Sequence, residues 1–389
     1  MSAPPTRSDV IEILATLVGF DSTSHLTNLP LIRWVEEYLD QHGVWHTRVQ
    51  ESADKSSLIA RIGPKAPGGI VLSGHTDVVP VIDQPWDTDP FVLHEEAGKL
   101  FGRGTCDMKS FLALALAYVP YFNEANLTKP IWLAFSQDEE VGCLGAAAMA
   151  EALLAHGAAP ALVVVGEPSD MQLVTAHKGI YSFETIITGK EAHSSMPHQG
   201  ANAVHIMGEL MGVIAGIRHH AATHAPNDAA GFTPAHSTVH IGVAEGGTAR
   251  NIIPRHARLL WEVRPVPGED IDALLAPFHD AAARFDAELK AIDADCGIET
   301  TQRSKVRGLA ADDDTTPHIS LAMQLSQTNQ THYVAYGTEG GIFQKHGLPV
   351  AVCGPGSIDQ AHQPNEFITL EQLELGMAWM QRLANTDSY

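Results

Sequence analysis

Short apolar runs alternate with segments of helical apolar spacing along the first part of the chain. β-branched apolar runs predict buried strands, and apolar positions three and four residues apart predict amphipathic helices. Their alternation predicts a mixed, mostly parallel sheet flanked by helices on both faces. The predicted strands are 45–49, 57–62, 70–72, 131–135 and 162–165, and the predicted helices are 10–17, 31–39, 108–122 and 144–155.

The pattern changes near Lys178, where strands predominate and two long helices separate them. This predicts a small α+β domain inserted into the first, with residues 1–178 and 299–389 forming the catalytic domain and residues 179–298 the insertion. The α/β pattern then resumes, and Thr369 to Gln372 form a capping box before a C-terminal helix. The elements predicted here are strands 181–188, 237–243, 257–263, 298–300 and 350–353, and helices 201–217, 271–285 and 319–326.

Composition narrows the class of protein. The chain has 389 residues, 44% of them hydrophobic, which is typical of a globular protein with two substantial cores. A net charge of −22 argues against a nucleic-acid partner. The apolar run 111–122 is too short to span a bilayer, residues 1–20 lack the features of a signal peptide, and the four cysteines are scattered. These features predict a cytoplasmic protein without a membrane partner.

Imidazole and carboxylate side chains follow several predicted strands or precede a helix. In open α/β sheets, ligands bind beyond the carboxyl ends of the strands, so these groups are expected to share one crevice. Two histidines with several carboxylates, and no thiolate cluster, suit zinc, cobalt or manganese. The residues are His75, Asp107, Glu139, Glu140, Glu167 and His362.

A pair of metal ions needs a bridging carboxylate and further ligands on each ion. One arrangement takes Asp107 as the bridge, with His75 and Glu167 on one ion and Glu140 and His362 on the other. Adjacent side chains diverge, so one of Glu139 and Glu140 is expected to bind metal and the other to act as general base.

Each of these short motifs also has a simpler interpretation. His75 and Asp77 alone are compatible with a turn, and the Glu139–Glu140 pair with a solvated loop. If the metal site exists, Asp77 is expected to accept a hydrogen bond from the second nitrogen of His75 or from its surroundings.

Long motifs in a fixed order carry a family resemblance. SGHTDVVP, GRGTCDMKS, DEEVGCLGA, GEPSDM and EAHSSMPHQGANA resemble the dinuclear-zinc amidohydrolases that include aminoacylases, succinyl-diaminopimelate desuccinylase and acetylornithine deacetylase. GTCDMK, DEEVGCLGA and GPGSIDQAHQPNEF are most similar to the acetylornithine deacetylase group. The resemblance covers nearly the whole chain. It implies two divalent ions, zinc first and cobalt as the alternative, bound by His75, Asp107, Glu140, Glu167 and His362.

The resemblance also implies roles beyond the metal ligands. Glu139 matches the general base, and the inserted domain matches a lid that forms a homodimer interface. His193 matches a histidine contributed to the neighbouring subunit's active site, where it stabilises the oxyanion. Its alternative is a strand-end histidine bonded to Ser194 or Ser195.

Four further positions are implied to hold the substrate. Asn251 matches a lid position, and the planar fork of Arg264 suits an α-carboxylate, although a surface arginine is the alternative. Gly356 could offer a backbone N–H to the same carboxylate or belong to a plain turn. Glu339 could face a cationic substrate tail or belong to a loop.

The implied reaction is removal of the acetyl group from N2-acetyl-L-ornithine by a metal-bridged hydroxide, with Glu139 as general base. The rival hydrolases are succinyl-diaminopimelate desuccinylase, acetylcitrulline deacetylase, a broad aminoacylase and a dipeptidase. A non-catalytic metal-binding homologue is the rival of a different kind. The complete set of matched ligands argues against it.

Overall fold

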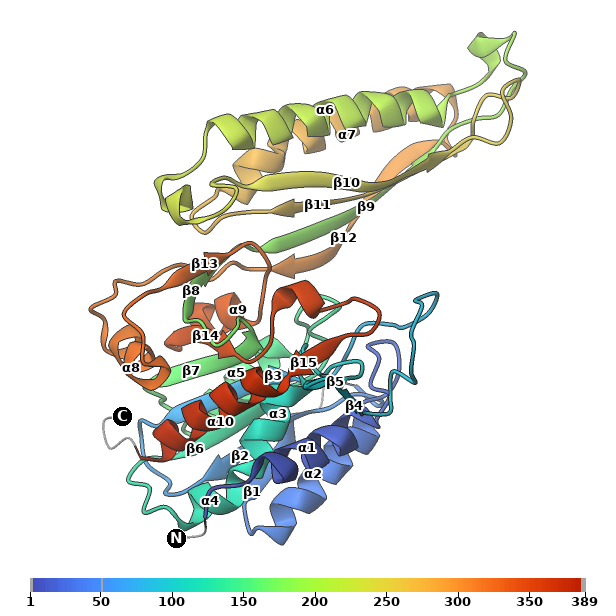
Figure 1. Cartoon of the computed structure of the whole chain (residues 1–389). Helices are drawn as coiled ribbons and strands as arrows, with labels where there is room; N and C mark the ends of the chain where they lie inside the picture. Colours follow the sequence, from blue (N-terminus) through green and yellow to red (C-terminus); the bar gives the residue numbers. More distant parts are fainter. Residues whose placement is uncertain (1–2, 50–51, 386–389) are drawn as a thin grey trace. The chain divides into compact units, whose positions relative to one another are not determined.

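The computed structural model describes residues 3–49 and 52–385, which form two compact units (Figure 1). The first unit takes in the described residues up to Ala176, together with Ala311–His332 and those from Thr338 onward. The second comprises His177–Ala310 and Tyr333–Gly337.

An eight-stranded mixed sheet, nearly all of it in the first unit, has the strand order β1-β2-β6-β3-β7-β14-β8-β13. The central pairs β6–β3, β3–β7 and β7–β14 are parallel, whereas β1–β2, β2–β6 and β14–β8 are antiparallel. The mixed α/β fold is therefore confirmed, with the parallel pairs gathered at the centre. The strands are β1 (Trp45–Val49), β2 (Ser57–Ile62), β3 (Ile70–His75), β6 (Ile131–Ser136), β7 (Leu162–Pro168), β8 (Val174–His177), β13 (His332–Val334) and β14 (Val350–Gly354).

Helices flank this sheet and bury its apolar residues. The single helix predicted over 108–122 is wrong: α3 ends at Ala117 and α4 begins at Val119, because Pro120 supplies no N–H to a continuous helix. Thr369 caps the last helix by accepting from the backbone N–H of Gln372, which confirms half of the predicted capping box; the Gln372 side chain accepts from the Gly356 N–H instead. The helices are α1 (Arg7–Val18), α2 (Leu29–Gln41), α3 (Lys109–Ala117), α4 (Val119–Glu124), α5 (Ala146–Ala155), α8 (Pro317–Ser326), α9 (Gly340–Lys345) and α10 (Leu370–Ala384).

Two glycines let α3 and its preceding loop approach the ends of the central strands. A Cβ at Gly74 of β3 would lie 2.6 Å from Met108 Cε, and one at Gly166 of β7 would lie 2.1 Å from the Phe111 ring. Both distances are shorter than real carbon contacts. This close approach brings Asp107 to the strand ends. Short elements in the same unit are β4 (His94–Glu96), β5 (Lys99–Phe101), β15 (Phe367–Thr369) and the 3-10 turn η3 (Ile358–Gln360), with the three strands ordered β15-β5-β4.

The second unit is an antiparallel four-stranded sheet in the order β10-β11-β9-β12, packed against two long helices (Figure 1). Its core includes Trp261, whose ring centroid lies 4.5 Å from that of Phe183 and 4.6 Å from that of Phe278. The sequence placed this domain at 179–298, whereas its last strand continues to Val306. The elements are β9 (Ile180–Thr188), β10 (Thr238–Gly246), β11 (His256–Arg264), β12 (Gly297–Val306), α6 (Ala203–Thr223), α7 (Ile271–Ile292), η1 (Pro197–Gln199) and η2 (Asn227–Gly231).

Candidate metal centre

The parallel centre of the sheet places the candidate ligands together. His75 is the last residue of β3, and Glu167 lies near the end of β7. Glu139 and Glu140 follow β6, and the loop after β14 carries His362. Asp107 stands directly before α3. Because the four strands run parallel, their carboxyl ends lie at one edge of the sheet.

Asp107 lies between the two histidines. Its Oδ1 is 3.0 Å from His75 Nε2, and its Oδ2 is 3.4 Å from His362 Nε2. Glu167 Oε1 is 3.8 Å from His75 Nε2, and Glu140 Oε2 is 3.0 Å from His362 Nε2. The structure thus brings together the two sets of side chains that the sequence hypothesis assigned to two ions.

Glu139 lies at the same centre. Donor atoms of His75, Glu139 and Glu167 lie within 4.8 Å of one another, and so do those of His75, Asp107 and Glu140. The geometry alone therefore allows Glu139 either to bind metal or to act beside it as a base.

The donor set fits divalent cations. Four carboxylates that are buried or nearly so face two imidazoles, and Glu140 Oε1 is buried without a hydrogen-bond partner among residues 3–49 and 52–385. Such a concentration of carboxylates needs positive charge, and an unpaired buried oxygen needs a partner. Imidazole nitrogen with carboxylate oxygen is the donor set of zinc, cobalt and manganese sites.

Burial and mutual repulsion perturb the acids of this centre in the metal-free protein. Burial raises the pKa of Glu139 to about 8 and that of Glu140 to about 7. Burial would also raise the pKa of Asp107, but hydrogen bonds from His362 and His75 bring that pKa below its ordinary value. The hydrogen bonds that His362 makes to Asp107 and to Glu140 raise the pKa of its imidazole to about 10. Bound cations would therefore displace protons from this cluster.

A hydrogen bond to the backbone fixes the orientation of the His75 imidazole. Its Nδ1 lies 2.9 Å from the backbone carbonyl oxygen of Asp77. A carbonyl oxygen can only accept, so Nδ1 carries the proton and Nε2 is the nitrogen available to a metal.

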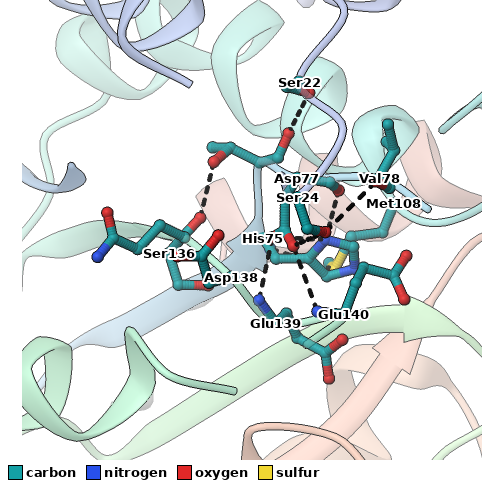
Figure 2. A network of polar contacts seen from close by, with 12 residues as sticks. Ser22, Ser24, His75, Asp77, Val78, Met108, Ser136, Asp138, Glu139 and Glu140 are labelled. Carbon is teal, nitrogen blue, oxygen red and sulfur yellow. Dashed lines mark hydrogen bonds and ion pairs between the residues drawn. The ribbon is translucent and has the colours of Figure 1, made fainter. Parts of the chain in front are cut away.

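The Asp77 carboxylate holds the loop of the two glutamates (Figure 2). Its Oδ1 accepts from the backbone N–H of Glu139 at 3.0 Å, and its Oδ2 accepts from that of Glu140 at 3.3 Å and from the Ser24 hydroxyl at 2.7 Å. The carboxylate is 3.7 Å from His75 Nδ1, which donates to the Asp77 backbone instead. Asp77 therefore acts on the surroundings of His75, through a loop that the sequence did not indicate.

Replacing Asp77 by Asn is expected to lower kcat/KM for the hydrolysis that the family resemblance implies. The expected loss is about 10- to 100-fold, the usual effect of disturbing groups that orient metal ligands. The amide would turn an N–H group toward a backbone donor or toward Ser24. Steady-state kinetics measure the loss, and Asp54→Asn at an exposed position controls for the charge. Wild-type kinetics for Asp77→Asn would contradict this role.

The Cys143 thiol is a contact that the sequence interpretation missed. Its Sγ donates to Glu139 Oε1 at 3.2 Å, and the backbone N–H groups of Gly142 and Cys143 donate to the Glu139 carbonyl oxygen. In the sequence, Cys143 stands out only as one of four scattered cysteines. The spacing Glu139 to Cys143 gives no signal of this contact, because it depends on the turn between them.

Glu339 and Gly356 lie in the first unit. The side chain of Glu339 is 1% exposed, and its Oε1 lacks a hydrogen-bond partner among the described residues. Burial raises its pKa to about 7, and the charges of His75 and Asp77 act on it. It is thus buried beside the centre. Gly356 has φ +92°, and its N–H already donates to Gln372 Oε1 at 3.1 Å.

Glu339→Gln is expected to change how stability depends on pH. In the metal-free protein the folded-state pKa of about 7 exceeds the reference value of 4.5. Protonated Glu339 therefore stabilises the fold below pH 4.5, and this contribution disappears as the pH rises through 7. Relative to wild type, the variant should gain about 3 kcal/mol of unfolding free energy between pH 4.5 and 8. Urea unfolding across this range measures the gain, with Glu12→Gln as the exposed control; parallel pH curves for Glu339→Gln and wild type would contradict it.

The second unit carries the other three predicted residues. His193 Nδ1 lies 2.7 Å from Ser195 Oγ, which is the local contact named as its alternative. Arg264 pairs with Glu262, its Nε 3.0 Å from Glu262 Oε1. Asn251 is exposed and accepts the Ser194 N–H through its backbone oxygen. Within this unit, the guanidinium fork of Arg264 is already engaged by a carboxylate.

Comparison with known proteins decides the family. Residues 71–386 match the model of peptidase family M20/M25/M40. The chain belongs to this family. It is an amidohydrolase of the M20 metallopeptidases, as the sequence predicted. An acetylornithine deacetylase of Myxococcus xanthus is 33% identical over 374 residues, covering 92% of both chains, and one of Photorhabdus laumondii subsp. laumondii is 34% identical over 363 residues, covering 92% of this chain and 89% of that protein.

Solved structures of M20 proteins share the fold. A tripeptidase from Staphylococcus aureus subsp. aureus Mu50 has a TM-score of 0.75 at 18% identity, covering 99% of this chain and 100% of the other. A dinuclear metal-binding M20 peptidase from Bacillus subtilis has a TM-score of 0.64 at 16% identity, covering 97% of each chain.

Within residues 3–49 and 52–385, no helix is long and apolar enough to cross a bilayer.

Proposed function

We propose that this M20 protein hydrolyses N2-acetyl-L-ornithine to L-ornithine and acetate, a step of arginine biosynthesis in the cytoplasm. The placement of Asp107 between His75 and His362, with Glu139 beside them, carries the proposal. The relatives named acetylornithine deacetylase favour this substrate.

His75, Asp107, Glu140, Glu167 and His362 would hold two divalent cations, with zinc preferred and cobalt as the alternative. When bound, such cations acidify water and polarise an acyl carbonyl. Glu139 would take a proton from the attacking water and return it to the leaving amine. The buried thiol of Cys143 donates to one oxygen of Glu139, and the other oxygen would take part in this transfer.

The second unit would supply the remaining groups. His193 would stabilise the oxyanion in the active site of a second copy of the chain, so we propose a homodimer formed through this unit as a lid. Asn251 and Arg264 would hold the substrate, which requires Arg264 to exchange Glu262 for the α-carboxylate. Because the Gly356 N–H already donates to Gln372, its part would require the same kind of exchange. Glu339 is buried beside the metal centre, so we place its charge there rather than at the far end of the substrate.

A substrate panel tests the proposal. Acetylornithine, acetylcitrulline, succinyl-diaminopimelate, acetylmethionine and a dipeptide are assayed with zinc, with cobalt and after chelation. Acetylornithine is expected to give the highest kcat/KM, by about tenfold, which corresponds to about 1.4 kcal/mol of discrimination. Equal rates on acetylornithine and acetylmethionine would indicate a broad aminoacylase instead, and preference for the dipeptide would indicate a peptidase.

A further inference from the structure

A buried carboxylate cradles the loop that carries Asp107. Glu366 Oε1 accepts from the backbone N–H groups of Cys106 at 2.8 Å and Asp107 at 3.0 Å. Its Oε2 accepts from the N–H of Gly104 at 3.0 Å and from Arg103 Nη1 at 2.7 Å. Three backbone donors in four residues thus converge on one side chain. Glu366 therefore fixes the path of the chain into Asp107.

Arg103 extends this contact to the loop of His362. Both Arg103 and Glu366 are 1% exposed, so the ion pair between them is shielded from solvent. Arg103 Nη2 donates to Gln84 Oε1 at 2.6 Å, and Gln84 Nε2 donates to the His362 carbonyl oxygen at 3.0 Å. Arg103 Nη1 also lies 3.4 Å from the Gln363 carbonyl oxygen. A continuous chain of hydrogen bonds therefore joins the backbone of Asp107 to that of His362.

His362 needs such support more than the other candidate ligands do. Its backbone has φ +63°, a conformation that L side chains seldom adopt, and its side chain is 53% exposed. By contrast, His75 ends a buried strand and its side chain is 1% exposed. The His362 imidazole therefore depends on loop contacts, and the Gln84 amide is one of them.

We propose that Glu366, Arg103 and Gln84 are positioning residues that hold His362 at its working distance from Asp107. They thereby maintain the ion position of Glu140 and His362, while the position of His75 and Glu167 depends on strand ends. This inference rests on the proposed two-ion function. It separates the two positions by what supports them: the sheet in one case, a polar network of loops in the other.

Gln84→Glu cuts the last link of the network selectively. A glutamate keeps an acceptor for Arg103 Nη2 and for Trp86 Nε1, but it loses the donor to the His362 carbonyl and turns an oxygen toward it. Gln84→Ala removes both links. Gln381→Glu, on the exposed surface of α10, introduces the same charge outside the network and serves as the matched control.

Calorimetric titration of the chelator-treated full chain with Zn²⁺ gives a readout independent of turnover. Wild type and Gln381→Glu are expected to bind two ions. Gln84→Glu should bind the first ion as wild type does and the second about 10- to 100-fold more weakly, with kcat reduced and its thermal midpoint nearly unchanged. Gln84→Ala should weaken the second ion similarly and also lower the thermal midpoint.

Two results overturn this inference in different ways. If wild type binds two ions and Gln84→Glu binds both with unchanged affinity, the network does not position His362, whereas the proposed function stands. If wild type binds fewer than two ions, the two-ion function fails first. Equal weakening of both ions in Gln84→Glu would also contradict the assignment to one position.

Discussion

Replacing Glu139 by Gln is expected to lower kcat for acetylornithine by about 10²- to 10⁴-fold, the range of general acid–base catalysis. Gln has the shape of Glu but cannot accept a proton from water near neutral pH. Burial raises the pKa of the wild-type Glu139 carboxyl to about 8 in the metal-free protein. Bound cations would lower this pKa, so that the carboxylate could take a proton from water near neutral pH. Zinc binding should persist, because five other side chains form the two candidate ligand sets.

Kinetics and metal content must be measured on the same samples of Glu139→Gln. Two bound ions together with the loss of turnover would assign Glu139 to proton transfer. Loss of an ion would instead make Glu139 a ligand, an arrangement that its position beside His75 and Glu167 also allows. Turnover within tenfold of wild type would reject a role in proton transfer.

Asp107→Ala is expected to remove metal from both positions and to abolish hydrolysis. Its two carboxylate oxygens face different histidines, so one substitution removes a partner from each ligand set. The cations would stabilise the transition state by several kcal/mol, and losing this stabilisation lowers the rate by about 10³-fold or more. Metal analysis after dialysis and acetate release measure the two effects, with Asp54→Ala as the exposed control. Retention of two ions would contradict the bridging position of Asp107.

Local patterns predicted much of the fold. Strands 57–62 and 131–135 were found because every residue but one of β2 and β6 is buried and apolar runs mark such strands. The three-residue strands β4, β5, β13 and β15 were missed because they are too short to show a period. The break between α3 and α4 was missed because the apolar run continues through Pro120.

The candidate ligands were predictable because each follows a recognisable strand or precedes a helix. Their supporting groups were not. Glu366 meets Asp107 across 259 positions of sequence, and Gln84 meets His362 across 278. No periodicity or short motif encodes contacts of that separation; they depend on how loops fold over the end of the sheet. The same reason explains why the sequence left two partners open for the Asp77 carboxylate, the second nitrogen of His75 or its surroundings, and could not name the two backbone N–H groups that it binds.

The most direct test of the proposed function is a zinc titration of the chelated protein, in which bound ions and acetate released from N2-acetyl-L-ornithine are measured in the same samples. We predict two ions per chain, with no turnover in the chelated protein and full turnover once both ions are bound. Turnover that persists without metal would contradict the proposal, and so would a protein that holds two ions and releases no acetate.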